Sequence, residues 1–283
     1  MHRVEHELDQ LSQLVRTIAE HLPACTVLLN TFAAPGLSGL GLLEGHTDYS
    51  VKDVVRVYNA RLERLVCQHP RMRLVDYESL VMRVGADRWT DERMWYLARM
   101  PLSHEALTRL AGLYVTSLRA LTGQAKKCLV LDLDNTLWGG VLGEDGLEGL
   151  QLGSSGIGEA YVDFQREILN LWKRGVALAI SSKNDADEVM AVIERHPDMI
   201  LRREHFAVIK IDWRDKVTHL QEIAEALRLG ADSLVFVDDQ PVERALVQAR
   251  LPQVTTLELP EDPSEFRRAL LESEAFHTLT LTP

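Results

Sequence analysis

The chain has 283 residues, a formal net charge of −11, and 46% hydrophobic and 26% charged residues. This balance is typical of a globular protein and excludes a largely disordered chain, which needs low hydrophobicity. The acidic excess excludes broad nucleic-acid binding, which requires a basic surface. No apolar run reaches the ~20 residues of a membrane span, and the N-terminus lacks a signal-peptide core, so we expect no membrane partner.

Three cysteines, Cys25, Cys67 and Cys128, make up the thiol content of the chain. Their spacing fits no metal site, and an odd number is a poor disulfide framework. We therefore expect a cytoplasmic protein, because the cytoplasm keeps thiols reduced.

The first part of the chain predicts a small α/β domain with few strands. Helical or strand periodicity places helices over about 1–25, 51–68 and 104–121, and strands over 26–30 and 73–76. The polar stretch Gly123–Lys127 then interrupts the pattern. At roughly 100–200 residues per domain, the length allows two domains, which we expect at 1–123 and 124–283.

The second part predicts a regular alternation of buried strands and helices. The expected strands are 128–132, 176–181, 206–210 and 233–238, and the expected helices are 158–173, 185–196, 216–228 and 242–250. Near-continuous apolar strands that alternate with helices are typical of a parallel sheet covered on both faces. Ligands of such sheets bind at the carboxyl ends of the strands.

Polar side chains follow each of these strands. They are Asp132 and Asp134 after the first strand, Ser181–Asn184 after the second, Lys216 after the third, and Asp238 and Asp239 after the fourth. Four clustered carboxylates repel one another unless a cation binds them, and an oxygen-only ligand set favours Mg²⁺. An isolated Asp after a strand equally fits a helix N-cap, but four in this order favour a metal site.

Two carboxylates two residues apart beside Mg²⁺ suit phosphoryl transfer. One carboxylate can attack phosphorus and form an aspartyl-phosphate, and the other can protonate the leaving oxygen and then deprotonate water. A nearby lysine and serine supply positive charge and a hydrogen bond to the phosphoryl oxygens.

The order Asp-Leu-Asp-Asn-Thr at 132–136, then Ser, Lys and Asp-Asp, resembles the haloacid dehalogenase superfamily and implies a Rossmann-like α/β fold. The resemblance implies that Asp132 is the nucleophile and a Mg²⁺ ligand. It implies that Asp134 is the general acid and base and binds the metal through its backbone carbonyl. It also implies that Ser182 and Lys216 contact the phosphoryl group. It implies that Asp238 and Asp239 complete the metal site.

A narrower resemblance, over about residues 85–275, is to the FkbH-like family. The segments that carry it are 127–141, 143–146, 158–165, 182–185 and 237–244. This resemblance implies a transferase and phosphatase that loads a glyceryl unit from 1,3-bisphosphoglycerate onto an acyl carrier protein in polyketide biosynthesis. Two alternatives stay open: a phosphatase of a small phosphorylated metabolite without acyl transfer, and a noncatalytic carrier-binding module of a synthase.

The sequence departs from this family's pattern at the thiol. Some relatives place a cysteine between the two motif aspartates or just before the motif serine, where this chain has Leu133 and Ser181. Cys128 lies four residues before Asp132, about 13 Å away along a strand. In an apolar strand a free cysteine behaves as a small core residue. Gln240, where Asn is expected, is a milder departure.

Further substrate contacts are expected around the first two motifs. The backbone N–H groups of Gly139 and Gly140 could approach a phosphate, with Trp138 shielding the site. Lys183 and Asn184 follow the motif serine and are expected to bind substrate. The segment 141–152 is too short for a large cap domain, so we expect an open site that suits a carrier protein's pantetheine arm.

The N-terminal domain faintly resembles the SGNH hydrolases. Asn30 follows a strand, and Asp91 and His104 precede a helix, but no Ser nucleophile stands in a Gly-Asp-Ser context. We expect a degenerate domain that packs or docks the carrier. Because carriers are commonly acidic, docking needs a local basic patch; the candidates are Arg71/Arg73, Lys126/Lys127 and Arg202/Arg203.

Overall fold

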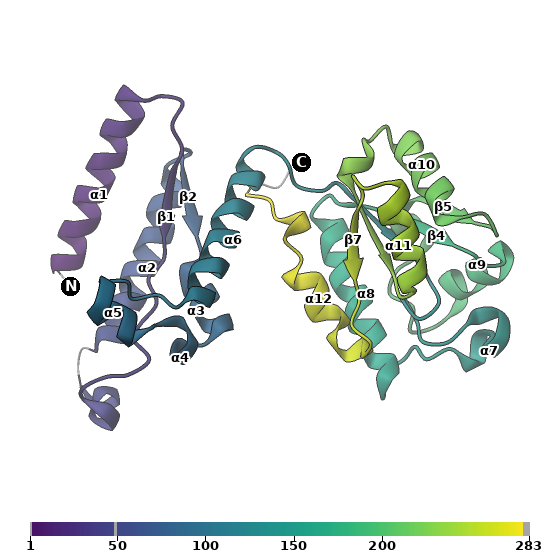
Figure 1. Ribbon diagram of the computed structural model, residues 1–283, viewed down its shortest axis with the longest axis horizontal. Coiled ribbons are helices and arrows are strands. Elements are labelled where there is room, and N and C mark those ends of the chain that lie inside the picture. Colours follow the sequence, from purple (N-terminus) through teal and green to yellow (C-terminus); the bar gives the residue numbers. More distant parts are fainter. Residues whose placement is uncertain (1, 48–49, 280–283) are drawn as a thin grey trace. The chain divides into compact units, whose positions relative to one another are not determined.

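The structure, a computed structural model, describes residues 2–47 and 50–279. It divides into two compact units, Met1–Arg119 and Ala120–Pro283. This division falls four residues before the expected boundary at 123. Most elements of both units are labelled in Figure 1.

The first unit is built from helices around a two-stranded parallel sheet, β1 (Val27–Asn30) and β2 (Met72–Val75). Its helices are α1 (His2–His21), α2 (Val51–Gln68), α3 (Tyr77–Val84), α4 (Ala86–Trp89), α5 (Glu92–Ala98) and α6 (His104–Leu121). The three long helices and both strands agree with the periodicity of the sequence. The three short helices lie between β2 and α6, where the sequence showed no clear pattern.

Local sequence signals explain where the long helices of this unit begin and how they pack. Ser50 caps α2 through a reciprocal pair of hydrogen bonds with Asp53, which satisfies two N–H groups that a helix start leaves unpaired. Leu8 of α1 and Leu62 of α2 are buried in one apolar cluster. Apolar burial of this kind, at about 25 cal/mol per Å², holds α1 against α2.

The second unit contains a five-stranded sheet in the order β5-β4-β3-β6-β7, with all neighbours parallel. Its strands are β3 (Cys128–Leu131), β4 (Ala177–Ser182), β5 (Phe206–Ile211), β6 (Leu234–Asp238) and β7 (Thr255–Glu258). The first four strands confirm the predicted parallel sheet. The edge strand β7 is additional.

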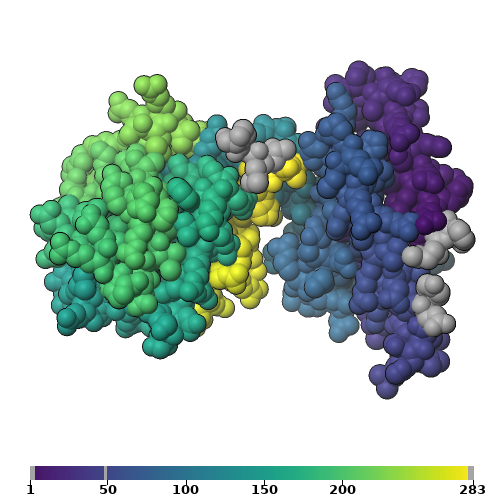
Figure 2. Space-filling view, turned by 180° about the vertical axis from the view of Figure 1, so that it is seen from behind, coloured from purple at the N-terminus to yellow at the C-terminus, as the bar shows by residue number. Residues whose placement is uncertain are grey.

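Helices cover both faces of this sheet, as predicted. They are α7 (Leu142–Gly149), α8 (Ile157–Lys173), α9 (Ala186–Arg195), α10 (Lys216–Leu227), α11 (Pro241–Arg250) and α12 (Phe266–Glu272). Buried side chains of α8, α9 and α12 share one apolar cluster with one face of the strands, and those of α10 and α11 share a second cluster with the other face. Figure 2 shows α12 (yellow) against α8 (teal).

The carboxyl ends of four adjacent strands, β5, β4, β3 and β6, lie at one edge of the sheet. The backbone N–H of Asp132 donates to Val237 O at 2.9 Å, and that of Asp212 donates to Ser182 O at 3.2 Å. These bonds continue the sheet one residue past β3 and β5, so the polar residues that follow the strands start from fixed positions. Among the helices of the described residues, none has both the length and the apolarity of a membrane span.

Candidate active site

A cluster of three carboxylates lies where β3 and β6 end. Ligand oxygens of Asp132, Asp238 and Asp239 all lie within 4.8 Å of one another. Asp132 is 8% exposed and Asp238 is fully buried. The predicted neighbourhood of these three residues is therefore present in the folded chain.

Lys216, the first residue of α10, balances part of this charge. Its Nζ donates to Asp132 Oδ1 at 2.6 Å and to Ser181 O at 2.6 Å, and it lies 3.2 Å from Asp238 Oδ2. The lysine itself is only 2% exposed. Burial lowers the pKa of Lys216, but attraction to Asp132 and Asp238 outweighs burial and raises it overall, so the ammonium stays charged.

One lysine does not neutralise three carboxylates. Burial, and then repulsion by Asp132, raise the pKa of Asp238 to about 6. The same two causes raise the pKa of Asp239. Both shifts show that the folded protein disfavours the charged forms of these groups, as expected when acidic groups share a site without enough cations.

The residues at this site fit a hard divalent cation. Oδ2 of Asp238 is buried and accepts no hydrogen bond within the described residues. Its other oxygen accepts from the backbone N–H of Gln240 at 2.8 Å, which fixes the carboxylate's orientation. An oriented carboxylate whose second oxygen faces only the Lys216 ammonium, beside two further carboxylates, fits the ligand set that Mg²⁺ prefers, since Mg²⁺ binds few carboxylates and keeps several waters.

Ser182, the last residue of β4, is placed for contact with a bound group. It is 2% exposed, and its hydroxyl makes no hydrogen bond to any residue that the structure describes. The hydroxyl is thus available to a phosphoryl oxygen, the role that the sequence predicts. The neighbouring Ser181 is different: it is fully buried and its Oγ lies 3.1 Å from Nδ1 of His219.

Three donors hold the carboxyl group of Asp134. Oδ1 accepts from the Trp138 indole at 2.9 Å and from the backbone N–H of Leu142 at 3.2 Å, and Oδ2 accepts from Asn184 Nδ2 at 2.9 Å. These bonds tie the first motif to α7 and to the turn after β4. Burial outweighs them and raises the pKa of Asp134, which favours the protonated form that a general acid needs.

The two glycines after the first motif are explained by packing and not by a phosphate. A Cβ on Gly139 would lie 2.9 Å from side-chain atoms of Gln151 and Tyr161, and Gly140 has a φ of +97°. The N–H of Gly139 donates to Gln151 O at 3.1 Å, and that of Gly140 donates to Asn135 Oδ1 at 2.9 Å. Both N–H groups thus have acceptors within the protein, which does not support the predicted phosphate contact.

The other three predicted substrate contacts also have protein partners. Trp138 is fully buried, so it cannot shield a substrate from solvent by direct contact; its indole positions Asp134 instead. The side-chain amide of Asn184 also donates to Asp134. Lys183 forms an ion pair with Glu243 of α11. These contacts give Asn184 and Lys183 a part in positioning the site, and their binding of substrate stays a prediction.

Three buried residues that support the site escaped the sequence reasoning. Nη1 of Arg244, on α11, donates to the backbone carbonyls of Asp238 and Asp239 at 2.6 and 2.8 Å. Gln165 of α8 is fully buried and donates to Leu137 O at 2.8 Å. His219 of α10 is the third. Gln165 and His219 bond Leu137 and Ser181, which are distant in sequence, whereas Arg244 bonds residues five and six positions before it. The available signals were a polar residue on the apolar face of a helix and, for Gln165 and Arg244, a place in the segments that carry the FkbH-like resemblance.

The predicted hydrolase-like residues of the first unit do not form a catalytic cluster. Asn30 exchanges hydrogen bonds with the Tyr114 hydroxyl at 2.7 and 3.0 Å. Asp91 caps α5 by accepting from the backbone N–H of Met94 at 3.0 Å. His104 is exposed, and no hydrogen bond joins it to Asn30 or Asp91 within the described residues. The likeness of this unit to SGNH hydrolases stays a prediction.

Cys128 lies in the core, on the first residue of β3. It is fully buried, and burial raises the pKa of its thiol to about 12. A thiol in this state is unreactive because acyl transfer requires the thiolate. This burial supports the interpretation of Cys128 as a core residue.

A solved structure matches both units of the chain. It is the N-terminal part of a Bacteroides fragilis protein, contains a phosphatase domain and was solved in complex with Mg. It is 31% identical to this chain, the match covers 98% of this chain and 73% of that chain, and the TM-score is 0.88. The chain belongs to the haloacid dehalogenase superfamily. The superfamily's motif order and the sheet described above agree with this assignment.

Two further solved structures match about half of the chain. One is a magnesium complex of a HAD family enzyme from Bacteroides thetaiotaomicron, with 12% identity over 53% of this chain and 100% of that chain and a TM-score of 0.37. The other is a HAD-superfamily hydrolase from Geobacter sulfurreducens, with 15% identity over 50% and 97% and a TM-score of 0.34. No family model and no curated protein matches the chain.

Proposed function

We propose that this chain is a Mg²⁺-dependent phosphatase in which Asp132 is the nucleophile. The observation that carries the proposal is the cluster of Asp132, Asp238 and Asp239 with Lys216 bonded to Asp132. Asp132, Asp238 and Asp239 would hold the metal through their carboxylates, and Asp134 through its backbone carbonyl. The cation, when bound, supplies positive charge that screens the carboxylates from one another and from a phosphoryl group.

The residues of the chain divide the reaction into two proton-balanced steps. Asp132 attacks phosphorus, the bond from phosphorus to the leaving oxygen breaks, and protonated Asp134 gives its proton to that oxygen. Asp134 then takes a proton from a water molecule, which attacks the aspartyl-phosphate and regenerates Asp132. Lys216 and the free hydroxyl of Ser182 stabilise the charge on the phosphoryl oxygens throughout.

The test is phosphate release from a simple phosphomonoester such as p-nitrophenyl phosphate, with Mg²⁺ or with a chelator. Asp132→Asn should abolish release, because an amide cannot attack phosphorus, and Asp134→Asn should slow it by roughly 10²–10⁴-fold. Asp187→Asn, on the exposed first turn of α9, is the matched control and should keep wild-type activity. Full turnover in excess chelator, or an active Asp132→Asn variant, would refute the proposal.

The acceptor and donor proposed for this site are an acyl carrier protein and 1,3-bisphosphoglycerate, as the FkbH-like resemblance implies. The short α7 between the first motif and α8 supports this proposal, because it leaves no room for a sealing cap domain. In this reaction the carrier's thiol attacks the acyl carbon of the donor, and the acyl phosphate leaves as inorganic phosphate. The 3-phosphoglyceryl thioester that results then loses its remaining phosphate by hydrolysis through Asp132 and Asp134, which leaves a glyceryl thioester on the carrier. Since Cys128 is buried, we propose that the glyceryl group passes directly to the carrier thiol.

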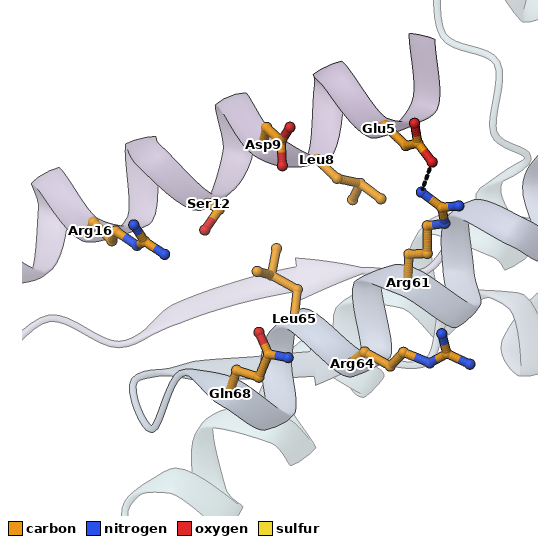
Figure 3. Close-up of a pocket in the computed structure, with 9 residues that line it drawn as sticks. All are labelled: Glu5, Leu8, Asp9, Ser12, Arg16, Arg61, Arg64, Leu65 and Gln68. Carbon is orange, nitrogen blue, oxygen red and sulfur yellow. Dashed lines mark hydrogen bonds and ion pairs between the residues drawn. The ribbon is translucent and has the colours of Figure 1, made fainter. Parts of the chain in front are cut away.

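A pocket of about 440 Å³ between α1 and α2 offers a docking site for an acidic carrier. Figure 3 shows its lining, which includes Arg16, Arg61 and Arg64 together with the acidic residues Glu5 and Asp9. Arg61 pairs with Glu5 at 2.7 Å, whereas Arg16 and Arg64 have no ion-pair partner within the described residues. Two free guanidinium groups on one surface complement an acidic protein and speed its association.

The predicted docking pairs are less available than this pocket. Arg73, Lys126, Arg202 and Arg203 each donate to backbone carbonyls, at distances between 2.6 and 3.4 Å. At least one member of each pair is therefore engaged with a backbone carbonyl of the protein. We transfer the docking proposal to the α1–α2 pocket.

Intact-mass analysis of a carrier protein incubated with enzyme, Mg²⁺ and 1,3-bisphosphoglycerate tests this proposal. A glyceryl adduct on the carrier supports it, and free phosphate without an adduct favours the alternative of a simple phosphatase. Arg16→Glu combined with Arg64→Glu should slow loading without changing hydrolysis of p-nitrophenyl phosphate. Arg109→Glu reverses one charge at an exposed position of α6, outside the pocket. It is the control for each single substitution, Arg16→Glu or Arg64→Glu, and should leave loading unchanged.

A further inference from the structure

His219 on α10 is a fully buried histidine whose two ring nitrogens both have partners. Nδ1 lies 3.1 Å from the hydroxyl of Ser181, and Nε2 lies 2.8 Å from Oδ1 of Asp212. The three side chains thus form a continuous hydrogen-bonded row from the surface, where Asp212 is partly exposed, to the end of β4. The phosphatase chemistry proposed above uses none of them.

The partners of His219 fix its tautomer. A carboxylate only accepts hydrogen bonds, so Nε2 carries a proton and donates it to Asp212. In the neutral ring Nδ1 is then the acceptor, and the Ser181 hydroxyl donates to it. The ring is held at both ends in one orientation.

This arrangement resembles a nucleophilic triad, but Ser181 is fully buried and cannot meet a substrate. Its backbone carbonyl, in contrast, reaches the active site, because it accepts from Lys216 Nζ at 2.6 Å. His219 and Lys216 lie three residues apart on α10, while Ser181 directly precedes Ser182. His219 therefore ties the helix that carries the lysine to the strand that carries the serine.

The other end of the row is also anchored. Asp212 directly follows β5, and its backbone N–H donates to Ser182 O at 3.2 Å. Its carboxylate accepts from Arg214 at 2.7 to 3.1 Å, and Arg214 in turn bonds Glu222 of α10. Hydrogen bonds from Arg214 and then from His219 hold the pKa of Asp212 far below its usual range, so this anchor stays charged.

We propose that His219 is a positioning residue that, through Ser181, sets the place of Lys216 Nζ beside Asp132. The proposal rests on the phosphatase function for its kinetic readout. The energetic reason is that a charged group must be held close to its transition-state position; misplacement by about 1 Å can cost on the order of 10²-fold in rate.

Substitutions that keep one partner of His219 at a time test this role. The amide of Asn reaches the position of Nδ1, so His219→Asn can keep the bond to Ser181, whereas Gln reaches the position of Nε2 and keeps only Asp212. We expect His219→Ala and His219→Gln to lower kcat by roughly 10- to 100-fold with little change in KM. The kcat of His219→Asn should stay close to that of the wild type. His196→Asn, a buried histidine at the end of α9, is the matched control and should leave kcat unchanged.

A second readout does not depend on turnover. Acetylation of Lys216 by a water-soluble ester, followed by peptide mass, measures how firmly the ammonium is held, because Lys216 is 2% exposed. We expect faster labelling of Lys216 in His219→Ala and His219→Gln than in the wild type or His219→Asn. Thermal midpoints, measured in parallel, identify any variant that is simply unfolded at the assay temperature.

Each outcome decides between the two proposals. If the wild type releases no phosphate but labelling changes as expected, the phosphatase function fails and the positioning role stands. If kcat falls while Lys216 labelling stays unchanged in folded variants, the loss does not act through Lys216 and the positioning role is overturned. It is equally overturned if folded His219→Ala keeps wild-type kcat and labelling.

A double-variant experiment tests the route through Ser181. Ser181→Ala should lower kcat as much as His219→Ala does, and the double variant should be no worse than either single variant. Additive losses would contradict a route through Ser181.

Discussion

Raising the pH of the metal-free protein should destabilise it, because Asp238 must ionise in a buried site. The pKa of this carboxyl is about 6 in the folded chain and 3.8 in its ordinary state. Since the folded-state pKa is the higher of the two, the protonated carboxyl stabilises the fold. This stability is complete below about 3.8 and is lost as the pH rises through about 6.

The size of the effect follows from the two pKa values. A difference of about 2.2 in pKa corresponds to about 3 kcal/mol at 1.36 kcal/mol per pKa unit. Integrating the proton balance between about pH 5 and about pH 7.5 gives a loss of about 1.4 kcal/mol from Asp238 alone. The raised pKa values of Asp134 and Asp239 add losses of the same sign.

Urea unfolding in excess chelator at these two pH values measures the loss. Asp238→Asn is the control, because its amide does not titrate, and its unfolding free energy should fall by about 1.4 kcal/mol less than that of the wild type over the same interval. Added Mg²⁺ should stabilise the wild type more at the higher pH, since a metal ligand must be deprotonated. If the unfolding free energies of the two proteins depend equally on pH, the raised pKa of Asp238 in the folded chain is refuted.

Three further outcomes are expected from other parts of the chain. Trp138→Phe removes a hydrogen bond that lowers the pKa of Asp134, so the limb of the pH–rate profile that reports Asp134 should move to higher pH; an unshifted limb would contradict the contact. Cys128→Ala should leave phosphate release and any glyceryl loading intact and cost on the order of 1 kcal/mol of stability. A thioester mapped to Cys128 after incubation with labelled donor would show instead that Cys128 carries the glyceryl group during transfer. His104→Ala should change no ester hydrolysis, because we expect none; esterase activity that disappears in this variant would restore the hydrolase interpretation of the first unit.

The sequence predicted the central sheet because its strands are buried on both faces. β3, β4 and β6 read as continuous apolar runs, and the acidic residues that follow them have no local reason to cluster except a shared site. The edge strand β7 was missed, since Thr255–Glu258 is only partly buried and its short sequence carries neither an apolar run nor a clear alternation.

The positioning residues could not be predicted, because sequence spacing does not say which side-chain atoms meet in the folded chain. A glycine indicates a tight approach or an unusual φ, but it does not say which atom approaches; at Gly139 the neighbours are Gln151 and Tyr161. Trp138 is adjacent to the motif, yet only its burial shows that it serves Asp134 rather than a substrate. Sequence order gave the residues of the metal cluster, and tertiary contacts decide which neighbours support them.

The central place of β3 has a consequence for native-state hydrogen exchange. This strand has hydrogen-bonded neighbours on both sides, β4 and β6, and its four residues are fully buried. Its amide protons should therefore exchange with solvent only through global opening, at the slowest rates in the second unit. Asp132 extends this strand by one bonded residue, so the nucleophile is attached to the segment that opens least often, while the half-buried edge strand β7 can open by itself without displacing it.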